Sequence, residues 1–253
     1  MSGNSVCRKS YCDWIVSAIA LVTLMLDAAA PVPQAKAADA EVPKPSSRTV
    51  RTVEGWTVRV DDRLLAPPDE AVGRRALQML ESKLVDITFV VPPERLRKLR
   101  SVTIVIDLSC GGLRTMQYHP SEDWLAEHGY SRDLARCVHI PVAADLLTAR
   151  TVREQPWVVL HELSHAYHDQ VLGFDEPKIR EAYEKYRSSG RGEQVMLFDG
   201  SRVRHYALTD QMEFFAEMTE AYFGSDDFFP FNRGELKTAE PEIYELMRSV
   251  WEP

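Results

Sequence analysis

The chain has 253 residues, of which 45% are hydrophobic and 27% charged, and its formal net charge at pH 7 is −8. This is ordinary globular composition, with enough length to bury a sizeable core. Nucleic acid and anionic membranes repel an acidic surface, so neither is expected as a partner.

The N-terminus has the pattern of a signal peptide. Arg8 and Lys9 precede an uncharged run at residues 14–26 (WIVSAIALVTLML), which is shorter than the roughly 20 residues that span a bilayer. Small residues in the segment 35–37 (AKA) predict cleavage after Ala37, so residues 1–37 are expected to be removed and the mature chain to be secreted or periplasmic. The alternative is an uncleaved membrane anchor; once the signal is removed, no membrane contact is expected.

Only Cys110 and Cys137 remain after the signal peptide, because Cys7 and Cys12 leave with it. Two cysteines in an exported chain predict one disulfide, Cys110–Cys137. The alternative is a pair of free buried thiols.

The mature chain is expected to form one catalytic domain of the α+β class at residues 49–253, after a flexible leader at residues 38–48. Apolar periodicity predicts strands at residues 50–60, 102–108 and 138–142 and helices at 71–87, 94–99, 124–129 and 143–150. After residue 150 the pattern is mostly helical, with helices expected at 156–173, 176–188, 211–223 and 241–251 and a short extended segment at 202–208. A small sheet is therefore expected in the first half and a set of helices in the second.

Residues 157–168 (WVVLHELSHAYH) contain His161-Glu162-x-x-His165. Positions i and i+4 of a helix lie on one face about a turn apart, so both imidazoles can reach one ion with Glu162 beside it. Two nitrogen ligands, an open position for water and a carboxylate base suit a zinc hydrolase. The alternative is a helix that carries two histidines by chance.

A third ligand is needed, and helix geometry excludes His168. Seven residues at 1.5 Å rise place His168 about 10 Å along the axis from His161, too far for one ion to bind both. We expect His168 at the surface or behind a ligand. His119, His128 and His139 lie far from the motif in sequence and are expected to be structural or exposed.

Glu213, Glu217 and Glu220 fall at i, i+4 and i+7, on one face of a helix whose other positions are mostly apolar. Three like charges on a buried helix are unfavourable unless a cation compensates them, and a zinc ion with its histidines is such a cation. Glu213 is then the expected third ligand, and Glu217 is expected to bond the free ring nitrogen of a ligand histidine. In the alternative, the three glutamates form a solvated face.

Residues 206–217 (YALTDQMEFFAE) resemble a segment of the anthrax lethal factor catalytic domain and its zincin relatives, which share the HExxH helix and a later Glu-Phe-Phe-Ala-Glu helix. The resemblance covers roughly residues 156–224. It implies a zincin-like fold, a gluzincin-type zinc site completed by Glu213, and Tyr206 facing the metal to stabilise an oxyanion. The alternative for Tyr206 is a buried core tyrosine.

The sequence thus predicts an exported endopeptidase with one zinc ion per chain, held by His161, His165 and Glu213, that cleaves a peptide or protein substrate. Glu162 would take the proton of the attacking water and deliver it to the leaving amine. The strand at residues 102–108 is expected to be an edge strand that pairs with the extended substrate backbone.

Two other functions fit the same motif. One is a zinc amidase that acts on a non-peptide or cell-wall amide. The other is a non-catalytic, zinc-stabilised binding module. The presence of Glu162 disfavours that module, because a purely structural site needs no base.

Overall fold

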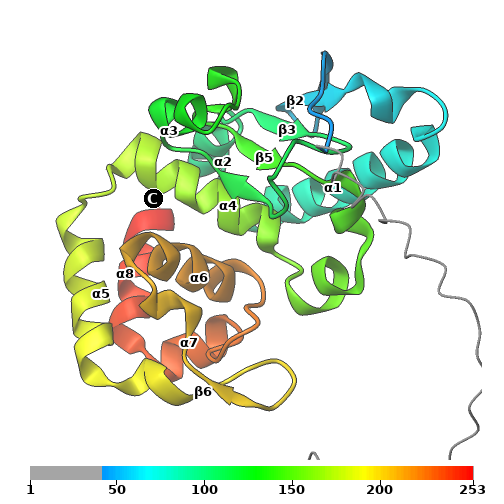
Figure 1. The fold of residues 1–253 in the computed structure, drawn as a ribbon. Helices are drawn as coiled ribbons and strands as arrows, with labels where there is room; N and C mark the ends of the chain where they lie inside the picture. The colour runs from blue at the N-terminus through cyan, green and yellow to red at the C-terminus, as the bar shows by residue number, and fades with distance from the viewer. Residues whose placement is uncertain (1–41, 253) are drawn as a thin grey trace, which may run out of the picture. The chain divides into compact units, whose positions relative to one another are not determined.

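The computed structural model describes residues 42–252, which belong to one compact unit, Glu41–Pro253 (Figure 1). The predicted signal peptide and the first residues of the leader lie outside the described residues. The described end of the leader is attached to the domain: Ser109 Oγ donates to Pro43 O at 2.7 Å, and Lys44 Nζ donates to Gly129 O at 2.9 Å. Among residues 42–252, the search for a helix of membrane-spanning length and apolarity finds none.

A five-stranded sheet has the order β1-β2-β3-β5-β4. Its strands are β1 Arg48–Val53, β2 Trp56–Asp61, β3 Ile104–Ile106, β4 Gln117–Tyr118 and β5 Val138–Ile140. The three inner strands are parallel, and the two edge strands, β1 and β4, pair antiparallel. The predicted strand at residues 50–60 is thus a hairpin, because Glu54 and Gly55 adopt the positive φ values of 50° and 88° that a tight turn requires. The predicted substrate strand is also wrong, because β3 is interior and both its edges are already paired.

The helices of the first half are α1 Glu70–Val90, α2 Pro93–Leu99 and α3 Glu122–Glu127. The second half contains α4 Val158–Tyr167, α5 Pro177–Ser189, the hairpin β6 Val195–Met196 and β7 Arg202–Val203, then α6 Gln211–Phe223, α7 Arg233–Ala239 and α8 Pro241–Trp251. The predicted α+β class is confirmed, and α6 and α8 have the predicted bounds. The helix expected at 143–150 is instead a 3-10 helix, Ala143–Leu147, and a π-helical turn, Arg150–Glu154.

Alternate residues of the inner strands face two separate cores, as the period of a strand requires. One face packs on α1 and α4 and belongs to the main core, which includes Val58, Val60, Ile104, Ile106, Val138 and Ile140. The other face carries a smaller cluster that contains Val105, Cys137 and Leu125 of α3. The sheet therefore separates the α4 side from the α3 side.

Helix α4 lies between the sheet and the helices of the second half (Figure 1). It is enclosed from several sides, so most of its residues are buried, including His161 and Glu162. At its start Trp157 packs on Gly224, at the end of α6, so closely that an added Cβ would lie 2.0 Å from the indole ring. This contact sets how near α4 and α6 approach each other.

The predicted disulfide is wrong: Cys110 and Cys137 are both free, buried thiols. Cys137 Sγ donates to Ala135 O at 3.4 Å and accepts from Arg59 Nη2 at 3.3 Å. Cys110 lies with Asp107 and His139, and its burial raises the pKa of its thiol to about 11. Each sulfur is directed at partners of its own rather than at the other sulfur.

Gly224→Ala is expected to destabilise the fold by about 1–3 kcal/mol, because the new methyl group would have to displace the Trp157 ring. Chemical denaturation measures the free energy of unfolding. Gly234→Ala is the matched control: it lies in the first turn of α7, its Cβ would meet only Asn232 Oδ1, at 3.3 Å, and a change within about 0.5 kcal/mol is expected. Equal stabilities of the two variants would contradict the packing argument.

Candidate metal centre

The two histidines of the motif and Glu213 meet between α4 and α6. Both ring Nε2 atoms approach the same carboxylate oxygen, Glu213 Oε2, at 3.0 Å from His161 and 3.3 Å from His165. The two rings meet edge to face with their centroids 4.8 Å apart. Three predicted ligands from two helices thus converge on one point, with their donor atoms within 4.8 Å of one another.

Glu213 is aimed at α4 by the start of its own helix. The Asp210 carboxylate caps α6 by accepting from Met212 N and Glu213 N at 2.8 and 2.9 Å. Burial favours a higher pKa for Glu213, but the hydrogen bonds from His161 and His165 outweigh it and hold that pKa well below its usual range. The carboxylate is therefore ionised and available to a cation.

Glu220, rather than Glu217, makes the close contact with the free nitrogen of His161. Glu220 Oε1 lies 2.7 Å from His161 Nδ1, whereas Glu217 Oε1 lies 3.4 Å from it. The imidazole spans two turns of α6, with Nε2 at Glu213 and Nδ1 at Glu220. The role predicted for Glu217 thus belongs mainly to Glu220, and both glutamates are buried.

Glu162 is buried beside the histidines, and burial raises its pKa above the usual value. Its Oε2 accepts from the backbone N–H of Tyr118, in β4, at 2.7 Å. This donor was not predicted, since a backbone N–H has no signature in the sequence. It holds one carboxylate oxygen and leaves Oε1 for chemistry.

Tyr206 opens the 3-10 helix Tyr206–Leu208, and its hydroxyl donates to Glu213 Oε1 at 3.4 Å. The side chain is 46% exposed, so the alternative of a core tyrosine is excluded. Burial of the hydroxyl and the nearby Glu213 raise the pKa of Tyr206 to about 12, so the phenol stays protonated and remains a donor.

His168 is buried rather than at the surface. Its ring packs against Phe174 and Phe215 at centroid distances of 5.2 and 5.0 Å. Burial lowers its pKa to about 4, and neither ring nitrogen has a hydrogen-bond partner among the described residues. It is a neutral core residue that packs against α6 through Phe215.

The α6 carboxylates meet the test for a cation site. Glu213, Glu217 and Glu220 have ion-pair partners within residues 42–252 that are histidines: His161, His165 and His205. Burial favours a lower pKa for His161, but its hydrogen bonds to Glu213 and Glu220 outweigh it and raise that pKa well above the usual value. The ring thus attracts positive charge where a divalent ion bound by His161, His165 and Glu213 would offset two negative charges.

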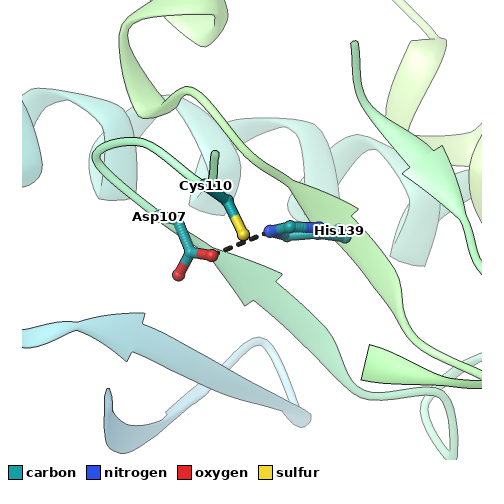
Figure 2. A group of neighbouring side chains, drawn as sticks. All are labelled: Asp107, Cys110 and His139. Atoms are coloured by element: carbon teal, nitrogen blue, oxygen red, sulfur yellow. Dashed lines mark hydrogen bonds and ion pairs between the residues drawn. The ribbon is translucent and has the colours of Figure 1, made fainter. Parts of the chain in front are cut away.

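Three other groups of possible ligands lie among the described residues. One of them, His161 with Glu217 and Glu220, shares His161 with the motif, and the other two fit a cation less well. In the group formed by Asp107, Cys110 and His139 (Figure 2), the Asp107 carboxylate is already neutralised. Arg48 donates to its two oxygens at 2.7 and 2.8 Å. In the group formed by His205, Glu217 and Asp226, His205 Nδ1 accepts from Ala207 N, so the neutral ring carries its hydrogen on Nε2 and has no lone pair left for a metal.

Neither a protein-family model nor a curated protein matches the chain. Among solved structures, it is similar to the Pro-Pro endopeptidase PPEP-2 from Paenibacillus alvei, at 19% identity and a TM-score of 0.44, with 79% of this chain and 99% of that chain covered. A similarity this low transfers no residue role or activity to the present chain.

Glu220→Gln is expected to weaken zinc binding about tenfold, because the charged acceptor on His161 Nδ1 becomes a neutral amide. Glu217→Gln is the matched control on the same helix face and should weaken binding less, since its oxygen lies farther from that nitrogen. Competition with a chromophoric chelator measures both affinities. A larger loss in Glu217→Gln would show that the roles of the two glutamates are reversed.

Proposed function

We propose that this chain is an exported zinc-dependent metallopeptidase. The observation that carries the proposal is the convergence of His161 Nε2, His165 Nε2 and the Glu213 carboxylate, with the Glu162 side chain beside them. The resemblance of residues 206–217 to the lethal factor segment supports it, and export follows from the predicted signal peptide.

His161, His165 and Glu213 would hold the zinc ion. Three protein ligands leave one position open, as catalytic zinc sites do. A zinc ion held there supplies a Lewis acid for the attacking water and for the substrate carbonyl. Glu220 fixes the ring of His161 through Nδ1, so that Nε2 is turned towards the metal position.

Glu162 acts as the general base. Its Oε2 is held by the Tyr118 N–H, so Oε1 takes the proton of the attacking water and then passes it to the leaving amine. Its buried position raises its pKa towards the working pH, which favours proton transfer in both directions.

Tyr206 stabilises the oxyanion. Its hydroxyl lies at Glu213, on the partly exposed side of the ligand set, and remains protonated. It can therefore donate a hydrogen bond to the carbonyl oxygen as negative charge develops there.

The substrate strand belongs beside β4 rather than β3. β4 pairs only with β5 inside the sheet, and its Tyr118 N–H points away from β5 to Glu162. An extended peptide laid along this outer edge would bring its backbone past the base.

Glu162→Gln is expected to lower kcat/KM by roughly 10²–10⁴-fold and to keep the bound zinc, because the base is lost and the ligands are unchanged.

Tyr206→Phe should lower kcat by about 10²–10³-fold, also with zinc retained. Cleavage of a broad peptide library and metal analysis of the purified protein give both readouts. Glu181→Gln, on the exposed face of α5, is the control.

A zinc-loaded wild-type protein that cleaves nothing in the library would overturn the peptidase proposal. Activity on an N-acyl or cell-wall amide would then identify an amidase. Loss of zinc in Glu162→Gln would instead assign that residue to the metal site.

A further inference from the structure

We propose that His119 is a positioning residue: through a buried relay of hydrogen bonds it holds β4 where the Tyr118 N–H fixes the catalytic base Glu162. The inference deepens the proposed function and rests on it, because it concerns the orientation of the base. Neither His119 nor its partners touch the metal ligands.

Neighbouring residues of β4 point to opposite sides of the sheet. Tyr118 faces α4: its N–H donates to Glu162, and its hydroxyl donates to Asp169 Oδ2 at 2.5 Å. His119 follows it and faces the α3 side, where its ring is 3% exposed and lies under Trp124 at 6.5 Å. What holds His119 on one face therefore places Tyr118 on the other.

A chain of hydrogen bonds runs from His119 into the sheet. His119 Nε2 lies 3.1 Å from His139 Nδ1, and His139 Nε2 lies 2.8 Å from Asp107 Oδ2. Arg48 ends the chain, with its guanidinium on both oxygens of Asp107. The four side chains come from β1, the end of β3, β5 and the end of β4, so the relay crosses the sheet.

The direction of the hydrogen bond between His139 and Asp107 follows from the charge at Asp107. A carboxylate paired with a guanidinium is ionised and only accepts, so His139 Nε2 must donate to it. His139 Nδ1 then shares the second hydrogen bond with His119 Nε2, whichever of the two nitrogens donates. The relay thus consumes both nitrogens of His139.

This assignment excludes a nucleophile at Cys110, although the thiol stands beside Asp107 and His139 as in a Cys-His-Asp triad (Figure 2). His139 has no nitrogen left to take the Cys110 proton, and burial raises the pKa of that thiol to about 11. The relay is a device for position, not for nucleophilic attack.

β4 needs such a device because it has only two residues and one neighbouring strand. Its backbone is joined to the start of β5 by two further bonds, from His119 N to Cys137 O at 3.2 Å and from Arg136 N to His119 O at 2.7 Å. The hydrogen bond between the His119 and His139 side chains adds a third connection to these two backbone bonds. Without it, the Tyr118 N–H is held less firmly against Glu162.

The test compares His119→Gln with His119→Asn in the full mature chain loaded with zinc. A glutamine amide reaches the position of His119 Nε2 and can donate to or accept from His139, whereas the asparagine amide is too short. Glutamine and asparagine are both polar and uncharged, so the two variants differ mainly in side-chain length. His128→Asn is the control, because His128 also stacks on Trp124, at 4.2 Å, but bonds only to Trp124 O of its own helix.

His119→Asn should lower kcat by roughly 10–100-fold with KM and zinc content unchanged, because the base is displaced while the ligands are not. Exchange of the Tyr118 amide hydrogen, followed by NMR, should be roughly tenfold faster. His119→Gln and His128→Asn should both resemble wild type. Unchanged kcat and amide exchange in His119→Asn, or equal losses in Asn and Gln, would overturn the proposal.

The amide exchange is measured without substrate, so it separates the two proposals. If wild type cleaves no peptide, the proposed function fails, while exchange at Tyr118 in His119→Asn still shows whether the relay holds β4. If wild type is active and the exchange is unaltered, only the relay proposal fails.

Discussion

The contact of two imidazoles on α4 with one carboxylate on α6 is the interaction on which the arrangement of the second half depends. His161 and His165 can reach Glu213 only because the two helices cross closely at this point. Gly224 permits that approach by leaving room for Trp157, and the Asp210 cap turns Glu213 inward. The Asp210 cap at the start of α6 and the glycine at its end therefore both allow this one electrostatic contact.

Several further carboxyl groups are buried beside this contact. Burial raises the pKa of Glu217, Asp226 and Asp227, all of which lie on or just after α6. Glu220 extends the group to the far nitrogen of His161. A divalent ion at the three ligands would favour the ionised form of these carboxyls, so ion binding and the packing of α4 on α6 are expected to stabilise each other.

The sequence was informative where periodicity decides the structure. Helical spacing identified His161 and His165 as a pair of ligands and excluded His168. It also indicated the helix face that carries Glu213, Glu217 and Glu220. The bounds of α6 follow from the uninterrupted helical pattern of residues 211–223. Whether Glu217 or Glu220 makes the close contact with His161 depends on how α4 and α6 cross. Residue spacing within one helix gives no information about that crossing.

Features that rest on long-range geometry were missed. A strand of two residues, β4, has no periodicity to detect, so its outer edge and the Tyr118 N–H that contacts Glu162 could not be foreseen. The cysteine count suggested a bond between Cys110 and Cys137, but pairing is decided by where each side chain points. His119 and His139 lie 20 residues apart and meet only because β4 and β5 pair.

The position of the bound ion tests the central claim most directly. Crystals grown with zinc, measured on both sides of the zinc absorption edge, would locate the ion by its anomalous scattering. The account predicts one peak per chain, about 2.0–2.2 Å from His161 Nε2, His165 Nε2 and a Glu213 oxygen. A peak at Asp107, Cys110 and His139 instead, or no peak between α4 and α6, would contradict it.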